Sequence, residues 1–218
     1  MSKVFWNERY AAHSTVYGEA PNEFFKTQLD NLLPGKILLP AEGEGRNAIY
    51  AASKGWQVTA FDYSERAQQK ALTHAKALAV TIDYTVQDMQ MIALPIQHYD
   101  VVALIYVHLQ ATLREKFFEQ VVRSLKPGGT IILEGFSANQ LKFNSGGPKE
   151  VGMLYTPALV KQLFQSLRFE FLIEEEILLN EGEFHKGLAS VVRVVAKKPE
   201  YFYDFKHRTK VVLTDVNV

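Results

Sequence analysis

The chain has 218 residues, of which 47% are hydrophobic and 22% charged, and its formal net charge at pH 7 is zero. This composition is typical of an ordered globular protein of one domain with a substantial core. The composition lacks the basic surplus typical of nucleic-acid-binding proteins, so it does not favour nucleic acid as a partner. Because the chain has no cysteine, the composition excludes disulfides, thiol catalysis and cysteine-ligated metal sites.

The sequence shows neither a signal peptide nor an apolar run long enough to cross a bilayer. We therefore expect a cytoplasmic protein with a small-molecule substrate and without nucleic-acid, membrane or metal partners. We interpret the chain as one domain in three parts: an N-terminal arm or lid at 1–35, a core at 36–198 and a tail at 199–218.

The N-terminal part combines aromatic side chains with one amphipathic segment. Asn22 is predicted to cap a helix that ends before Pro34-Gly35 and has an apolar face of Phe24, Phe25, Leu29, Leu32 and Leu33. The aromatic residues before it, Trp6, Tyr10 and Tyr17, have two interpretations. They belong either to an arm packed on the core or to a lid that closes over a bound ligand and excludes water.

Residues 37–55 predict a strand, a glycine-containing loop and a helix. Ile37–Leu39 is a short apolar strand, and the helix from Arg46 to Lys54 ends at Gly55, the usual residue of a left-handed cap. Gly43 and Gly45 in the loop permit positive φ and close approach of a ligand. A strand, a glycine loop and a helix N-terminus together are typical of a nucleotide-type binding site.

Two ligand classes fit this loop. Gly43-x-Gly45-x-x-Ala48, with Asp62 about 20 residues on, matches the dinucleotide fingerprint. However, Glu42 and Glu44 place two carboxylates where a pyrophosphate would lie. S-adenosylmethionine has no phosphate and carries a sulfonium and an ammonium, so charge favours it. An NAD(P)-dependent oxidoreductase and a donor-binding protein without turnover remain the alternatives.

The rest of the chain alternates between predicted strands and helices. Strands are predicted at 57–61, 81–86, 99–107 and 130–134, with helices from Ser64 and from a capping box at Thr112 and Glu115. A long loop at 135–155, a helix after Thr156 and strands at 169–179 and 188–196 follow. The pattern predicts an α/β, doubly wound, mostly parallel seven-stranded sheet with an antiparallel last strand. The tail is β-rich at Lys210 to Thr214.

With these residues in view, the chain resembles the class I S-adenosylmethionine-dependent methyltransferases, above all the branch that contains tellurite-resistance and thiopurine methyltransferases. The resemblance covers roughly 5–198 and implies a Rossmann-like methyltransferase fold. The motifs that carry it are Gly43-x-Gly45-Arg46-Asn47-Ala48, Val58-Thr59-Ala60-Phe61-Asp62, Asp88 after the third strand, and Leu125-Lys126-Pro127-Gly128-Gly129. The chain departs from the family pattern at Leu39 and Ala41, where an acidic residue and a glycine are usual, and Glu42 is expected to supply the missing charge.

The resemblance implies that the cofactor is S-adenosyl-L-methionine and suggests which residues hold it. Asp62 would bind the ribose hydroxyls, Asp88 and Met89 would flank the adenine, and Ile105 and Tyr106 would border the methyl group. The full set of expected cofactor-binding residues is Glu42, Gly43, Gly45, Arg46, Asp62, Tyr63, Asp88, Met89, Ile105 and Tyr106.

Methyl transfer from a sulfonium is a direct displacement that depends on proximity and orientation, so we expect no catalytic triad. A general base is needed only if the acceptor enters protonated. Tyr17, His108 and His185 are the catalytic candidates, for shaping the pocket or removing a proton. We further predict that 5–22, 135–155 and 181–187 converge at the carboxyl edge of the sheet, with Tyr17 and His185 facing inward.

Overall fold

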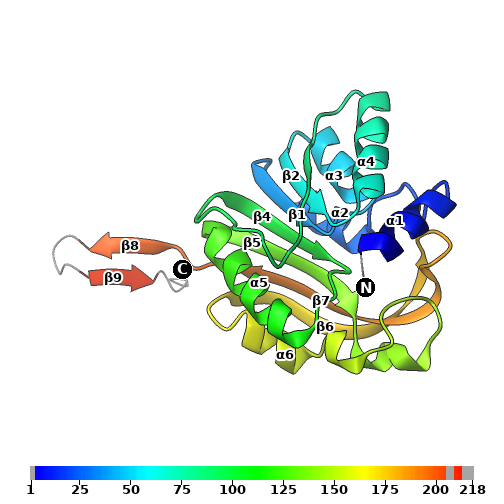
Figure 1. The fold of residues 1–218 in the computed structure, drawn as a ribbon. Coiled ribbons are helices and arrows are strands. Elements are labelled where there is room, and N and C mark those ends of the chain that lie inside the picture. Colours follow the sequence, from blue (N-terminus) through cyan, green and yellow to red (C-terminus); the bar gives the residue numbers. More distant parts are fainter. Residues whose placement is uncertain (1–2, 205–208, 213–218) are drawn as a thin grey trace.

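The computed structural model describes residues 3–204 and 209–212, and its main feature is a seven-stranded sheet in the order β3-β2-β1-β4-β5-β7-β6 (Figure 1). The strands are β1 (Lys36–Pro40), β2 (Gln57–Asp62), β3 (Asp83–Val86), β4 (Tyr99–Ile105), β5 (Leu125–Phe136), β6 (Arg168–Asn180) and β7 (Lys186–Lys197). The first five strands pair in parallel, and β7 runs antiparallel to both β5 and β6. The predicted fold class is confirmed.

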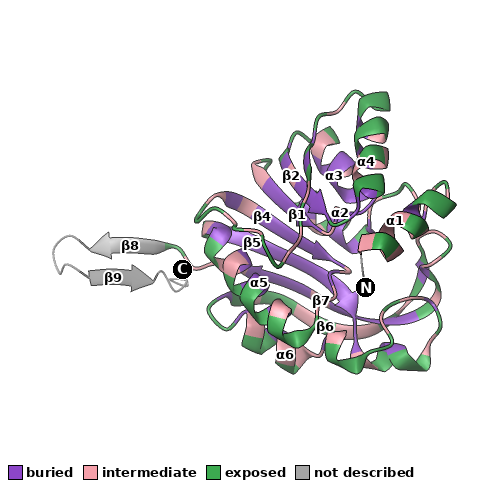
Figure 2. Cartoon of the chain, in the orientation of Figure 1, coloured by how far each residue is buried: buried purple, intermediate pink, exposed green. Residues whose placement is uncertain are grey.

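Helices cover both faces of the sheet (Figure 1). α2 (Glu23–Leu29), α3 (Arg46–Ser53) and α4 (Glu65–Ala77) pack on one face, and α5 (Ala111–Ser124) and α6 (Pro157–Leu163) on the other. Side chains that alternate along a strand point to opposite faces. In β1, Ile37 and Leu39 therefore join one core cluster, whereas Leu38 joins the other. Figure 2 shows the central strands buried between these layers, whereas the edge strands β3 and β6 are largely half-buried or exposed.

Three predicted helix caps are present. The side chains of Asn22, Ser64 and Thr156 accept hydrogen bonds from backbone N–H groups three residues ahead, at 2.9, 3.1 and 3.1 Å. The prediction of a capping box at Thr112 and Glu115 was wrong. α5 begins at Ala111 and its cap position is Gln110, which makes no side-chain cap hydrogen bond. The chain already turns into the helix before Thr112, which therefore lies inside the first turn.

Several boundaries differ from the pattern. The third strand is only Asp83–Val86, and the fifth begins at Leu125 because that residue pairs with Tyr99 of β4. An unexpected helix, α1 (Lys3–Ala12), forms at the start of the arm, and the long loop contains the 3-10 turns η1 (Ala138–Lys142) and η2 (Val151–Met153). In the tail, β8 (Tyr201–Asp204) pairs with β9 (Thr209–Val212). The end of the predicted tail strand, at 213–214, lies outside the described residues.

The segments of interest meet at one edge of the sheet. Because β1, β2, β4 and β5 are parallel, the glycine loop, Asp62, Tyr106 and the segment after Phe136 all follow the carboxyl ends of strands. β6 is antiparallel to β7 and thus parallel to β5, so the 181–185 turn lies at the same edge. Ligands of open α/β sheets bind at this edge.

In the described ranges, no helix combines the length and apolarity needed to cross a membrane.

Candidate functional site

The glycine loop between β1 and α3 is held in a conformation that requires glycine. Gly43 and Gly45 have φ of +63° and +86°. A Cβ on Gly45 would lie 2.7 Å from the Cβ of Ala71 in α4, so no side chain fits there. The hydroxyl of Tyr84 donates to the carbonyl oxygen of Gly43 at 2.7 Å and fixes the loop from the β3 side.

Glu42 is a buried carboxylate at the N-terminus of α3. Its Oε1 accepts hydrogen bonds from the backbone N–H groups of Asn47 and Ala48, both at 2.7 Å, whereas Oε2 lies 3.4 Å from Nδ2 of Asn47. Burial raises the pKa of Glu42 to about 7, although these donors and the Arg46 charge act in the opposite direction. Oε2 is thus the freer oxygen of a carboxylate that a nearby positive charge would stabilise.

Glu44 has a different task, although the sequence pattern groups it with Glu42. Its Oε2 accepts from the backbone N–H of Val16 at 2.7 Å, and its Oε1 pairs with Nζ of Lys70 at 2.8 Å. The same Lys70 ammonium donates to the carbonyl oxygens of His13 and Ser14. Glu44 therefore ties the N-terminal arm to the glycine loop and already has its own cation.

Asp62 lies on the other side of the glycine loop, at the end of β2. We call the glycine loop together with Glu42 and Asp62 the cradle. Oδ2 of Asp62 accepts from the backbone N–H of Gly43 at 3.1 Å, and its Oδ1 accepts from that of Ser64 at 2.9 Å. Burial raises the pKa of Asp62 to about 6 despite these bonds. A carboxylate oxygen can accept more than one hydrogen bond, so both oxygens can still receive a hydroxyl. This is the chemistry that a ribose diol requires.

The other predicted cofactor residues lie further along this edge. Tyr63 is exposed after Asp62, and Asp88 and Met89 are half-buried after β3. Oδ1 of Asp88 accepts from the backbone N–H of Gln90 at 2.9 Å, which shapes the turn. Met89 packs against the core cluster on the α5 side of the sheet.

The cradle fits a cationic nucleoside such as S-adenosylmethionine. Throughout the part of the chain that the structure describes, neither Glu42 nor Asp62 forms an ion pair with a lysine, arginine or histidine. Buried charges without a partner are costly. A ligand that brings positive charge to Glu42 and a diol to Asp62 would offset that cost, whereas a pyrophosphate beside Glu42 would increase it.

The N-terminal arm covers the cradle. Tyr10 of α1 is buried, and a Cβ on Gly43 would lie 2.7 Å from its hydroxyl. Oδ1 of Asn7 accepts from Oγ of Ser64 at 2.6 Å, so α1 also packs over the turn between β2 and α4. The arm is closed over the glycine loop in this structure.

A second polar cluster lies beside the cradle, around Glu134 of β5. Its buried carboxylate accepts hydrogen bonds at 2.6, 2.7 and 2.6 Å from Nδ2 of Asn22, the hydroxyl of Tyr106 and Nε of Arg193. Tyr106, directly after β4, has a φ of +54°, an uncommon conformation for a bulky residue and one found at functional sites. Ile105 before it is buried at the end of the strand.

Glu181, in the turn between β6 and β7, links this cluster to the cradle. Its Oε1 accepts from Nδ2 of Asn22 at 2.9 Å, and its Oε2 accepts from Nη2 of Arg46 at 2.9 Å. Arg46 therefore points from the start of α3 toward Glu181. Burial alone would raise the pKa of Glu181, but His185 and Arg46 hold it at about 2, so the group is a carboxylate at neutral pH.

The rings of Tyr17 and His185 lie against each other. Their ring centroids are 4.4 Å apart, and the His185 ring also lies 4.4 Å from Tyr106 and 5.2 Å from Phe136. Nδ1 of His185 is 3.5 Å from Oε2 of Glu181. A Cβ on Gly146 would lie 2.9 Å from the His185 ring. The three segments predicted to converge thus meet around His185.

His108 lies under this cluster with both ring nitrogens engaged. Nδ1 lies 2.9 Å from the carbonyl oxygen of Met153, and Nε2 accepts from the backbone N–H of Phe136 at 3.1 Å. Burial lowers the pKa of His108 to about 4, so the ring is neutral at physiological pH. This geometry favours a structural role, in which His108 fastens the long loop to β5.

Sequence reasoning singled out neither the side-chain amide of Asn22 nor the carboxylate of Glu181 as part of the site. Glu134 carried a usable signal, because a glutamate inside the apolar run of β5 needs buried partners. Asn22 was recognised only as a cap. Its side-chain amide spans two carboxylates that are 47 residues apart, and no local pattern reports such a contact.

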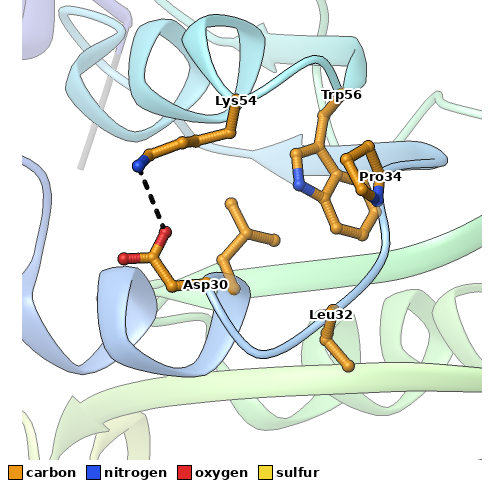
Figure 3. A pocket seen from close by; sticks show the side chains of 6 residues that line it. Asp30, Leu32, Pro34, Lys54 and Trp56 are labelled. Atoms are coloured by element: carbon orange, nitrogen blue, oxygen red, sulfur yellow. Dashed lines mark ion pairs between the residues drawn. The ribbon is translucent and has the colours of Figure 1, made fainter.

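A surface pocket of about 330 Å³ lies away from this site (Figure 3). Its lining residues are Leu29, Asp30, Leu32, Pro34, Lys54 and Trp56. Figure 3 shows Lys54 directed toward Asp30, with 3.7 Å between Nζ and Oδ1. Pro34 and Trp56 precede β1 and β2, so the pocket belongs to the amino edge of the sheet, opposite the glycine loop.

Comparisons with known proteins agree with the geometry. Residues 37–129 match the family model described as a methyltransferase domain. Over 120 residues the chain is 23% identical to the ubiquinone/menaquinone biosynthesis C-methyltransferase UbiE from Pseudomonas fluorescens (strain SBW25), which corresponds to 55% of this chain and 41% of that protein. The chain thus spans about two fifths of the length of this curated relative.

Two solved structures illustrate the similarity of the fold. TehB from Haemophilus influenzae superposes with a TM-score of 0.69 at 16% identity, over 82% of this chain and 62% of that one. The N-methyltransferase NodS from Bradyrhizobium japonicum, solved in complex with S-adenosyl-l-homocysteine, superposes with a TM-score of 0.68 at 14% identity, over 92% of this chain and 100% of that one. Residues 37–129 thus match a methyltransferase domain, and the chain shares its fold with TehB and NodS; together with the glycine loop, Asp62 and the reversed β7, these findings support a class I S-adenosylmethionine-dependent methyltransferase.

Proposed function

We propose that this chain moves a methyl group from S-adenosylmethionine to a small-molecule acceptor in the cytoplasm, by direct displacement and as a single methyltransferase domain. One observation carries the proposal: two buried carboxylates without an ion-pair partner in the described chain, Glu42 and Asp62, flank the glycine loop at the carboxyl edge of the sheet. The closed arm supports a small acceptor, because the polar cluster beside the cradle is buried. Zero net charge gives no support to nucleic acid as a partner.

Each residue then has a proposed role. Asp62 holds the ribose hydroxyls, and Oε2 of Glu42 faces the positively charged methionine part of the donor, its sulfonium included. Backbone atoms of Gly43 and Gly45 would lie against the donor. Asp88 and Met89 flank the adenine, while Ile105, Tyr106, Tyr17 and His185 border the space next to the methyl group.

The bound donor supplies a methyl group that is already activated by the sulfonium. The protein's task is to orient the acceptor and exclude water, and proximity of this kind accounts for much of the catalysis in such reactions. The arm serves both purposes, because Val16 is tied to Glu44 and Asn22 is tied to Glu134 and Glu181. Opening the arm would admit the ligands, and closing it would complete the site.

Calorimetry with S-adenosylhomocysteine and, separately, with NAD tests the donor class. We expect binding of S-adenosylhomocysteine and none of NAD, because a pyrophosphate at the glycine loop would face the buried carboxylate of Glu42. Tight NAD binding would support the oxidoreductase alternative. Radiolabelled methyl transfer to a small-molecule metabolite extract tests turnover, and donor binding with no transfer to any fraction would support a donor-binding protein instead.

A further inference from the structure

The pair formed by His185 and Glu181 has the geometry of an oriented base. The side chain of His185 is 93% buried, and its Nδ1 makes no hydrogen bond in the described chain although it lies 3.5 Å from Oε2 of Glu181. The distance is longer than an ordinary hydrogen bond. Catalytic hydrogen bonds often shorten only when substrate is present.

The tautomer of His185 follows from this neighbour. Glu181 is ionised, and a carboxylate can only accept hydrogen bonds, so the ring nitrogen that faces it must carry the proton. In the neutral ring the other nitrogen, Nε2, then has the lone pair. No described residue forms a hydrogen bond with Nε2.

Several charged or titratable groups face His185 from the surrounding elements. Arg46 of α3 disfavours a second positive charge on the ring, whereas Glu181 and Glu134 favour it. Tyr17 of the arm and Tyr106 after β4 contact the ring, and both have pKa values raised by burial, so they are neutral. His108 lies nearby and is also neutral. Burial lowers the pKa of His185 itself, so the ring is uncharged at neutral pH.

We propose that the acceptor carries a protonated nucleophile, a hydroxyl on an aromatic ring, and that Nε2 of His185 removes its proton. The proposal rests on the proposed function and deepens it. The acceptor's oxygen forms a bond to the methyl carbon, and the carbon–sulfur bond breaks with its electron pair left on sulfur. The proton passes to Nε2, and Glu181 stabilises the resulting imidazolium. A thiolate would need no such base.

The aromatic walls explain why the acceptor should itself contain a ring. The ring centroids of Tyr17, Tyr106 and Phe136 lie 4.4, 4.4 and 5.2 Å from that of His185, and these residues belong to the arm, to the segment after β4 and to β5. Aromatic rings pack favourably against one another in stacked or edge-on arrangements. Tyr17 lies on the arm, so opening the arm would uncover the imidazole and let a flat acceptor take a place beside it.

The first test uses phenol, aniline and thiophenol as probes, each with S-adenosylmethionine at pH 8, and measures release of S-adenosylhomocysteine. We expect His185→Gln to lower kcat on phenol at least about a hundredfold, the usual effect of a general base, and to leave aniline and thiophenol nearly unchanged, because a neutral amine and a thiolate attack without first losing a proton. His74→Gln in α4 is the matched control. Turnover of thiophenol alone by the wild-type protein, or an equal loss on all three probes, would overturn the proposal.

The second test does not need turnover. Nitrogen NMR of the wild-type protein should show His185 neutral at pH 7 with its proton on Nδ1, and Glu181→Gln should lower its pKa further. Where phenol turns over, kcat should rise as the pH rises through this pKa, and the midpoint should move to lower pH in Glu181→Gln. A proton on Nε2 would overturn the proposal alone, whereas a failure to bind S-adenosylhomocysteine would overturn the proposed function as well.

Discussion

Glu42 and Glu44 are two positions apart and have separate environments. Glu42 is buried and receives backbone N–H groups from the start of α3, whereas Glu44 pairs with Lys70 and fastens the arm. The burial of Glu42 raises its pKa to about 7, so the folded protein binds this proton more tightly than the unfolded chain does. Its contribution to stability is therefore present below about pH 4.5 and is lost as the pH rises through about 7.

Glu42→Gln should consequently stabilise the ligand-free protein at high pH and weaken donor binding. We expect the free energy of unfolding to rise by about 2–3 kcal/mol at pH 8 and to change little at pH 4.5, from about 1.4 kcal/mol per pKa unit. S-adenosylmethionine should lose more affinity than S-adenosylhomocysteine, because only the former carries the sulfonium. Denaturant unfolding and calorimetry measure these effects.

Glu44→Gln is the matched control for Glu42→Gln, since it should reduce the affinities of both ligands alike by loosening the arm. If Glu42→Gln also affects the two ligands equally, this carboxylate does not sense the sulfonium.

Asp62→Ala should weaken S-adenosylhomocysteine binding at least about tenfold. Hydrogen bonds to a charged group contribute roughly 1.5–3 kcal/mol each, and the alanine variant loses those to both ribose hydroxyls. The variant also loses the bonds from Gly43 and Ser64, so its folding must be checked by circular dichroism. Asp83→Ala, at the exposed start of β3, should bind normally. Unchanged affinity in folded Asp62→Ala would refute the assignment.

At the scale of elements, the arm and the β6–β7 turn form one closed unit. Arg9 lies 4.6 Å from the centre of the Phe184 ring, and His13 pairs with Glu183 at 3.1 Å. The backbones also touch, because a Cβ on Gly182 would lie 2.6 Å from the nitrogen of Gly18. A change in the turn should therefore alter the position of the arm.

Gly182→Ala should open this unit. Gly182 has a φ of +84°, and the added Cβ would meet only backbone atoms, which cannot move as a flexible side chain would. We expect weaker donor binding and faster hydrogen exchange in 5–22 than in the wild-type protein. Gly152→Ala is the control, because its nearest neighbour would be an oxygen of the Glu150 side chain at 3.8 Å. Wild-type exchange and affinity in Gly182→Ala would show that the contact does not hold the arm.

At the scale of the whole molecule, the sheet separates two cores. The α2–α4 side supports the glycine loop, whereas the α5–α6 side is built around stacked aromatic rings such as Phe118 and Phe164, whose centroids are 5.4 Å apart. Stability and donor binding should therefore respond separately to changes in the second core.

Phe118→Ala should destabilise the protein by about 3–5 kcal/mol, the usual cost of removing a buried phenylalanine. The folded fraction should still bind S-adenosylhomocysteine with wild-type affinity. Leu72→Ala, on the exposed side of α4, should cost less than about 1 kcal/mol. Urea unfolding and calorimetry give both quantities. A large loss of donor affinity in folded Phe118→Ala would mean that the two faces of the sheet are coupled.

The sequence by itself determined the alternation of strands and helices along the chain, the reversed strand near its end, the glycine loop and three of the helix caps. These features depend on local periodicity, on glycine at positive φ and on short side chains that bond to neighbouring backbone groups. Asp62 could be found in the same way, because its position at the end of a strand follows from the chain itself.

Only the tertiary structure decided which charged groups meet. Glu134, Glu181 and Asn22 come from distant parts of the chain, and their hydrogen bonds form only once β5, the β6–β7 turn and the arm are brought together. The different tasks of Glu42 and Glu44, and of His108 and His185, were likewise decided there. The packing of distant segments decides which carboxylates and imidazoles are buried and which of them find a partner. Packing is a property of the folded molecule rather than of neighbouring residues in the sequence.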